Sequence, residues 1–258
     1  MSLADLFPDG AHRFQMGLHP AEPGSFFAPR DPTGRILAER QRWLAQDPDR
    51  YAFLDPEAAP LLAAFAHSRS LPTSLSLAAL GGRLEPDVLF LAPDATGEFR
   101  LRGGVLCFPT GWALRDKLGG TVAEIHGVVP GLNQTLGPAM RQMLSRLRPG
   151  QAWQRSNWGL AATAELNLHP ALGRPVPEPP VRLDRLWLRV EEQLLMALPG
   201  VAGLVFAIRI ELPRLDELAR DPAAAAGLAR ALRAMPADLA AYKRIATIRE
   251  PLLALLEP

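Results

Sequence analysis

Residues 185–195, RLWLRVEEQLL, decide the fold. Aliphatic side chains at positions 186, 188 and 190 alternate with Trp187, Arg189 and Glu191. Successive side chains of a β-strand point to opposite faces of a sheet, so this two-residue period predicts a strand with one apolar face. Arg189 and Glu191 are expected to share the other face.

Similar stretches lie on both sides of this strand. Residues 152–162 and 201–212 predict two more strands, and we expect the three to form the centre of an antiparallel sheet. Residues 87–91 and 98–108 predict a β-hairpin, whose second half is expected to be irregular or bulged around Gly103-Gly104.

The rest of the chain is mainly helical in pattern. Helices are predicted at residues 34–46, 56–68, 111–118 and 134–148, in a segment opened by Asp221-Pro222, and at 248–256. Residues 125–130, IHGVVP, are expected to form a loop, and residues 1–30, rich in Pro, Gly and Phe, an extended arm whose aromatic side chains pack on the domain. Without regular βαβ alternation, an α+β fold follows, with a single domain over residues 1–258, helices packed on the sheet and a helical C-terminal region.

Composition excludes several classes of function. The net charge is +1, from 28 basic and 27 acidic side chains, so nucleic acid is not an expected partner. No apolar run reaches the 18 or so residues of a spanning helix and the first twenty residues do not resemble a secretory signal, so no membrane association and a cytoplasmic location are expected. Cys107 is the only cysteine, which excludes an intramolecular disulfide and an all-cysteine iron-sulfur cluster.

Familiar catalytic motifs are also absent from the sequence. It contains no dinucleotide-binding or Walker glycine pattern, no closely spaced His/Cys set and no Gly-x-Ser-x-Gly elbow. Any redox chemistry would therefore draw its electrons from a separate protein.

A series of short motifs carries a resemblance over residues 17–256. In chain order they are CFP at 107–109, W at 112, KLG at 117–119, IH at 125–126, VP at 129–130, RSNW at 155–158, LRVEEQ at 188–193, FAIR at 206–209 and YK at 242–243. Their succession resembles the haem-binding alpha subunit of the haem-dependent oxidative N-demethylase family.

The resemblance implies a PAS-like sheet that binds haem b. It also implies a monooxygenase that uses dioxygen to oxidise a methyl group on a small secondary amine such as dimethylamine, so that formaldehyde leaves. Electrons would come from NADPH through FMN and an iron-sulfur cluster, all carried by separate reductase subunits.

His126 is the candidate iron ligand, because imidazole is a common proximal donor to haem and its neighbours are Gly and an apolar Val-Val-Pro. The alternative is a hydrogen-bonded loop histidine. His169 is the competing ligand or a pocket-lining residue. Cys107 could supply a thiolate, but its alternating position favours core packing.

Five further residues are candidates for the site. Arg155 and Arg189 could pair with haem propionates or be ordinary strand arginines. Glu191 could hold a cationic amine or form an ion pair with Arg189. Asn157 could donate a hydrogen bond to bound dioxygen while Trp158 packs against the macrocycle, or both could belong to a core turn.

The C-terminal pair Tyr242-Lys243 could seal the pocket or meet a partner, or the lysine could simply lie at the surface. Two other functions stay open for the chain. It could be a non-catalytic haem sensor or carrier, or a haem-free interaction module that keeps the fold.

Overall fold

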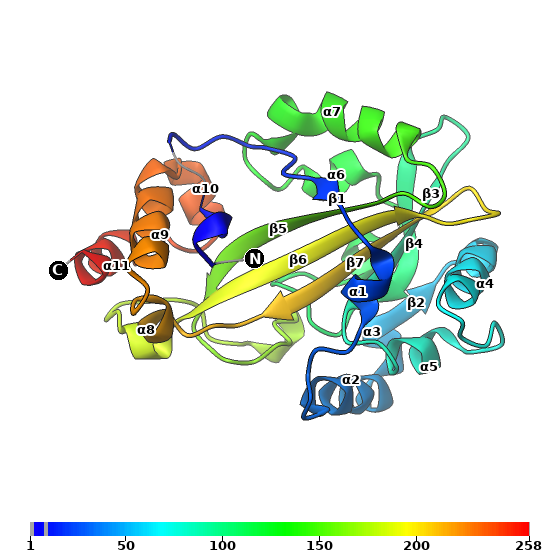
Figure 1. The fold of residues 1–258 in the computed structure, drawn as a ribbon, viewed down its shortest axis with the longest axis horizontal. Helices are drawn as coiled ribbons and strands as arrows, with labels where there is room; N and C mark the ends of the chain where they lie inside the picture. Colours follow the sequence, from blue (N-terminus) through cyan, green and yellow to red (C-terminus); the bar gives the residue numbers. More distant parts are fainter. Residues whose placement is uncertain (1–2, 8–9, 258) are drawn as a thin grey trace.

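The computed structural model describes residues 3–7 and 10–257. Its strands are β1 (His19–Pro20), β2 (Ala52–Leu54), β3 (Asp87–Pro93), β4 (Phe99–Val105), β5 (Ala152–Ala161), β6 (Trp187–Ala197) and β7 (Leu204–Glu211). Within the described residues they form one sheet in the order β1-β5-β6-β7-β3-β4-β2 (Figure 1). Every pairing is antiparallel, so the expected α+β fold with an antiparallel sheet is confirmed.

The predicted strands lie close to their expected positions. β6, the strand in residues 185–195, is paired with β5 on one side and β7 on the other. The hairpin β3–β4 has a register shift between Phe90 and Leu91, which confirms the predicted irregularity in the second half of the hairpin. The extra residue is Arg102, and the next position requires glycine, because the φ of Gly103 is +141° and a Cβ there would come within 2.2 Å of the Phe53 carbonyl oxygen.

Helices surround the sheet. They are α1 (Pro23–Phe27), α2 (Arg35–Gln46), α3 (Pro48–Tyr51), α4 (Ala59–Ser68), α5 (Leu77–Gly81), α6 (Val122–His126), α7 (Leu132–Arg146), α8 (Leu215–Leu218), α9 (Pro222–Ala234), α10 (Ala237–Tyr242) and α11 (Arg249–Leu256). Single 3-10 turns are η1 (Leu3–Leu6), η2 (Pro56–Ala58), η3 (Arg115–Lys117), η4 (Pro170–Leu172) and η5 (Leu183–Arg185).

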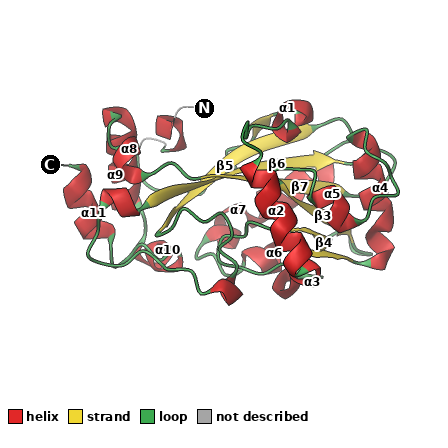
Figure 2. Ribbon diagram, turned by 90° about the horizontal axis from the view of Figure 1, so that it is seen from below, coloured by secondary structure: helices red, strands yellow, loops and turns green. Residues whose placement is uncertain are grey.

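The two faces of the sheet differ in what covers them. Figure 2 shows α1, α8 and α9 on one side of the sheet and α6 and α10 on the other. We call them the α9 face, which includes Leu188 and Val190 of β6, and the α6 face, which includes Arg189 and Glu191. The assignment follows from the alternation of side chains along β6 and from the contacts of its aliphatic residues with the C-terminal helices.

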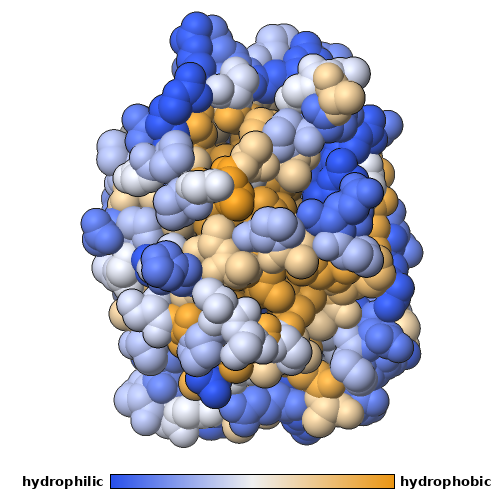
Figure 3. Space-filling model, turned by 90° about the vertical axis from the view of Figure 1, so that its right-hand side faces the viewer, coloured by the Kyte–Doolittle hydropathy of each residue, from blue (hydrophilic) through white to orange (hydrophobic). Residues whose placement is uncertain are grey.

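Two cavities of about 220 and 340 Å³ lie at the end of the sheet away from the C-terminal helices. One is between the β3–β4 turn and α7, and the other between α4 and the β6–β7 turn. Apolar side chains gather in the middle of this end of the molecule (Figure 3). Neither cavity is lined by His126, Arg155 or Glu191.

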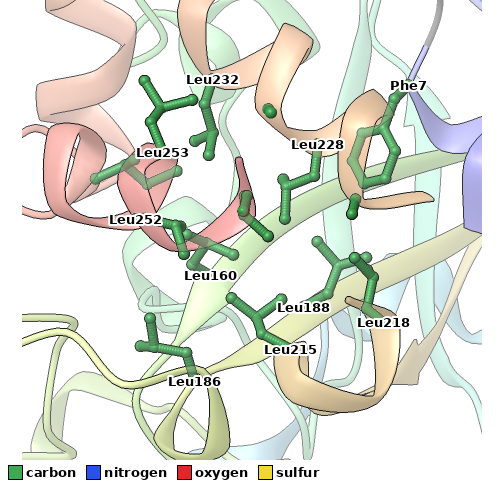
Figure 4. Packing of buried hydrophobic residues seen from close by; sticks show 14 of the residues in the cluster. Phe7, Leu160, Leu186, Leu188, Leu215, Leu218, Leu228, Leu232, Leu252 and Leu253 are labelled. Carbon is green, nitrogen blue, oxygen red and sulfur yellow. The ribbon is translucent and has the colours of Figure 1, made fainter. Parts of the chain in front are cut away.

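Helices α9 and α11 pack on the α9 face. Leu228 and Leu232 of α9 and Leu252 of α11 surround Leu160 of β5 and Leu188 of β6 (Figure 4). Asp221 caps α9 by accepting hydrogen bonds from the backbone N–H groups of residues 223 and 224, as the Asp-Pro pair predicts. The helical C-terminal region is therefore confirmed.

One local prediction is wrong, and two are only partly correct. Residues 111–118 contain only the turn η3, because the preceding backbone is bridged to Leu168 and Gly111 N–H donates to the Leu168 carbonyl at 3.1 Å. Residues 125–130 are not entirely a loop, since His126 is the last residue of α6. That short helix is stabilised by a capping box in which Thr121 and Glu124 each accept from the other's backbone N–H.

The N-terminal arm is not extended throughout. It contains η1 and α1, and α1 begins with a proline after the capping residue Glu22. Phe7, Phe26 and Phe27 are buried, so the expected packing of its aromatic side chains is confirmed. Residues 1–2 and 8–9 of the predicted arm lie outside the described residues.

Candidate functional site

Strands β5 and β6 bring most of the candidate residues together. Asn157 is the direct partner of Glu191, Arg155 of Gln193, and Gly159 of Arg189. Directly opposed residues of an antiparallel pair place their side chains on the same face. Arg155, Asn157, Arg189 and Glu191 therefore share the α6 face.

This part of the α6 face is incompletely covered. Arg155, Asn157, Glu191 and Gln193 are half-buried. β6 lies between β5 and β7, whereas in the described sheet residues 155–159 of β5 have no strand on their outer side, because β1 pairs only with residues 153 and 154. On the α9 face of β6, Leu188, Val190 and Leu194 are fully buried. Solvent therefore reaches these polar side chains on the α6 face, and a ligand can reach them by the same route. We call this part of β5 and β6 the half-open surface.

Glu191 is held by two hydrogen bonds from neutral groups. The Thr110 hydroxyl donates to Oε1, and Gln193 Nε2 donates to Oε2 at 2.9 Å. The expected ion pair with Arg189 is indirect, since Arg189 Nε donates to Thr110 Oγ1 at 2.8 Å. Among the described residues Glu191 forms no direct ion pair, although its charge acts to raise the pKa values of Arg155, Arg189 and Lys243.

Arg189 holds two loops beneath the site. It is 1% exposed, and its Nη2 donates to the carbonyl oxygens of Phe108 and Leu166, each at 2.8 Å. Burial lowers the pKa of Arg189 to about 10, opposed by the charges of Glu191 and Asp87. Its Nη1 is buried with no partner among the described residues.

His126 and Arg155 have buried nitrogens without partners. His126 Nδ1 and Arg155 Nε are both buried and unbonded within the part of the chain that the structure describes. Burial, followed by the charges of Arg155 and Lys117, lowers the pKa of His126. The imidazole is therefore neutral at physiological pH and keeps a lone pair for a metal. Burial also lowers the pKa of Arg155, while Glu191 opposes the shift.

Lys243, at the end of α10, reaches the outer edge of β5. Its Nζ donates to the Trp158 carbonyl oxygen at 2.5 Å and to Asn157 Oδ1 at 3.4 Å. It also lies 5.5 Å from the Trp158 ring centroid. The indole itself is on the α9 face, opposite Val190, and packs edge-on against Phe7 at 5.4 Å. Trp158 is thus separated from the other candidates by the sheet.

His169 and Cys107 belong to other surroundings. His169 Nδ1 accepts from Ala171 N–H at 3.2 Å, and its ring packs edge-on against Tyr51. It shows no contact with Arg155 or Glu191 within the described residues. Cys107 is fully buried, which confirms core packing, and burial raises the pKa of its thiol to about 12.

Two residues of the site were missed from the sequence. Gln193 lies two positions after Glu191, so the same alternation could have placed it on the α6 face. Thr110 has no comparable signal, because it reaches Glu191 across 81 positions of sequence.

The described residues form neither a carboxylate, histidine and cysteine metal site nor a membrane-spanning helix. Over residues 3–7 and 10–257, no group of three or more His, Cys, Asp or Glu side chains is placed to hold a metal ion. Within the same residues, no helix has the length and apolar character needed to cross a bilayer.

Comparison with known families gives a match over most of the chain. The family described as haem-dependent oxidative N-demethylase, alpha subunit-like, matches residues 39–253. This range contains β2 to β7, the half-open surface of β5 and β6, and His126. The chain belongs to the family of haem-dependent oxidative N-demethylase alpha subunit-like proteins.

Proposed function

We propose that this chain binds haem b through His126 and is the monooxygenase subunit of an oxidative N-demethylase. The substrate would be a small secondary amine such as dimethylamine. In balance, the amine, dioxygen, two electrons and two protons give the demethylated amine, formaldehyde and water. The observation that carries the proposal is the pair of unpartnered buried nitrogens, on His126 and on Arg155, whose charge acts on the His126 imidazole.

The residues fit such a group. Burying a polar nitrogen without a hydrogen bond costs free energy, and an iron bound at Nδ1 would give the neutral imidazole of His126 its missing partner. Arg155, which forms no ion pair among the described residues, is suited to a haem propionate. Arg189 fits less well, because four of its contacts are already to Thr110 and to backbone carbonyls. His169 is the weaker ligand, since its Nδ1 already serves as a cap.

Haem iron, when bound, supplies the activation of dioxygen. The chain's own residues bind and orient the amine. Glu191 would accept hydrogen bonds from the ammonium group and balance its charge. Thr110 and Gln193 keep that carboxylate in one orientation, and Asn157 offers a donor beside it. Trp158, on the other face, supports β5 and does not line this surface.

Electrons require partner proteins. We expect NADPH, FMN and an iron-sulfur cluster on separate reductase subunits, in the cytoplasm where NADPH is available. The single buried Cys107 cannot hold a cluster. The alpha-subunit designation of the family supports an assembly of this kind.

The test is haem reconstitution. Wild type, His126→Ala and the matched control His169→Ala would be mixed with haemin, and absorption spectra recorded for the oxidised, reduced and carbon monoxide forms. We expect a Soret band in wild type and His169→Ala and its loss or shift in His126→Ala alone. Formaldehyde release from methylated amines with a reductase would then separate an oxygenase from a haem sensor or carrier. A wild type without any Soret band would refute the proposal and favour a haem-free interaction module.

A further inference from the structure

Asn157 and Glu191 form a neighbouring pair on the half-open surface. They are direct partners in the β5–β6 ladder, and both side chains are half-buried on the α6 face. The Cβ atoms of such partners lie about 4.5–5.5 Å apart. A single small ligand can therefore contact both side chains.

Lys243 fixes which way the Asn157 amide points. An ammonium group can only donate hydrogen bonds, so the atom facing it, at 3.4 Å, must be the amide oxygen. The reverse orientation would bring two donors together. Lys243 is itself held by the Trp158 carbonyl at 2.5 Å. The Asn157 NH₂ group consequently points away from Lys243 and has no partner among the described residues.

Glu191, in contrast to the Asn157 NH₂ group, offers hydrogen-bond acceptors. An ionised carboxylate only accepts hydrogen bonds, and each of its oxygens has a second acceptor site beyond the bond from Thr110 or Gln193. Arg189 donates to the Thr110 oxygen, so the single hydroxyl proton of Thr110 is left for Glu191. The surface therefore presents a fixed donor beside a fixed acceptor.

We infer that this pair recognises N-methylated amino acids, whose ammonium group would bind Glu191 and whose carboxylate would accept from Asn157. Dimethylammonium satisfies only Glu191 and leaves the amide donor to water, so it gains one hydrogen bond fewer than an amino acid that pairs with both groups. The positive charges of Arg155 and Lys243 further favour a ligand with an anionic group. Burial lowers the pKa of Lys243, while the charge of Glu191 opposes that shift. In this arrangement Lys243 is a positioning residue. The inference rests on the proposed function for its chemistry, but not for its binding test.

The test measures binding to the haem-free full chain by isothermal titration calorimetry. Sarcosine (N-methylglycine) and dimethylammonium chloride are the two probes, at the same ionic strength. We expect sarcosine to bind at least about tenfold more tightly, as one charge-assisted hydrogen bond can provide. Asn157→Leu removes the donor at similar volume and Lys243→Met frees the amide, so both variants should reduce the preference to less than about threefold. Lys117→Met is the matched control, since it removes a positive charge that acts on His126 and has no hydrogen bond to Asn157.

Each outcome decides the inference. Equal binding of the two probes, tighter binding of dimethylammonium, or no binding of either overturns it. An unchanged preference for sarcosine in Asn157→Leu, with a native circular dichroism spectrum, also overturns it. This variant decides the inference even if Lys243→Met fails to fold. A colourless protein that still prefers sarcosine refutes the haem proposal alone. A haem-loaded enzyme that releases formaldehyde from dimethylamine but shows no preference refutes this inference alone.

Discussion

Asp87 offers the sharpest test of what holds the site in place. Its Oδ1 accepts from Arg40 Nη1 at 2.6 Å, and both side chains are 0% exposed. The same carboxylate accepts from the backbone N–H of Cys107 at 2.7 Å and of Phe108 at 3.0 Å. It thereby fixes the start of the loop that carries Thr110 to Glu191.

Replacing Asp87 with Ala should be severely destabilising. Removal of one partner of a buried ion pair costs about 3–5 kcal/mol, because the other charge stays buried without compensation. The two orphaned backbone N–H groups push the loss towards the upper end of that range. Since total stability is typically about 5–15 kcal/mol, a loss of about 5 kcal/mol would remove between about a third and all of it.

The assay is urea unfolding at 25 °C, followed by tryptophan fluorescence and circular dichroism. The double variant Asp87→Leu with Arg40→Met should recover part of the loss, because no unpaired charge remains, but not all of it, because the N–H groups of Cys107 and Phe108 still lack an acceptor. Asp184→Ala, which breaks an exposed pair with Arg182, serves as the control and should change little. A loss below about 1 kcal/mol in Asp87→Ala would refute this reasoning.

Two further predictions concern other parts of the fold. Burial raises the pKa of the Cys107 thiol to about 12, so the native protein at pH 8 should not react with Ellman's reagent, whereas the protein in urea should release one equivalent; rapid reaction of the native protein would contradict the burial. Thr121→Ala removes the N-cap of α6 and should cost about 1 kcal/mol in urea unfolding, whereas Thr121→Ser should keep most of it; an equal loss in both variants would show that the cap is not the cause.

The strands could be predicted because their signal is local. In β6, burial of residues 188, 190 and 194 follows directly from the two-residue period of the sequence. The helix α6 was missed although its capping box, Thr121 to Glu124, is also a local signal. Residues 111–118 have helical spacing, but their backbone neighbourhood is set by residue 168, which no local pattern reveals.

The residues of the candidate site also divide into those that a local sequence pattern predicts and those that only the folded chain brings together. The common face of Arg189 and Glu191 followed from their spacing, and it is confirmed. The pairing of Asn157 with Glu191 depends on the register between two strands, which their individual patterns leave open. The links through Thr110 and Lys243 join residues 81 and 86 positions apart, so only the folded chain brings them together. Roles in ligand binding for His126, Arg155, Asn157 and Glu191 stay predictions.

The pairing of β3 with β7 also determines how late during synthesis the sheet can be completed. Asp87 of β3 is paired with Ile208, so the two partners are separated by 121 positions. A ribosome adding about 5–20 residues per second needs roughly 6–24 s to make that stretch. During this time the β3 edge has no strand beside it, and such an edge can pair with another nascent chain. Slow or crowded expression should therefore favour aggregation before the seventh strand emerges, and chaperones that cover exposed strand edges should raise the yield.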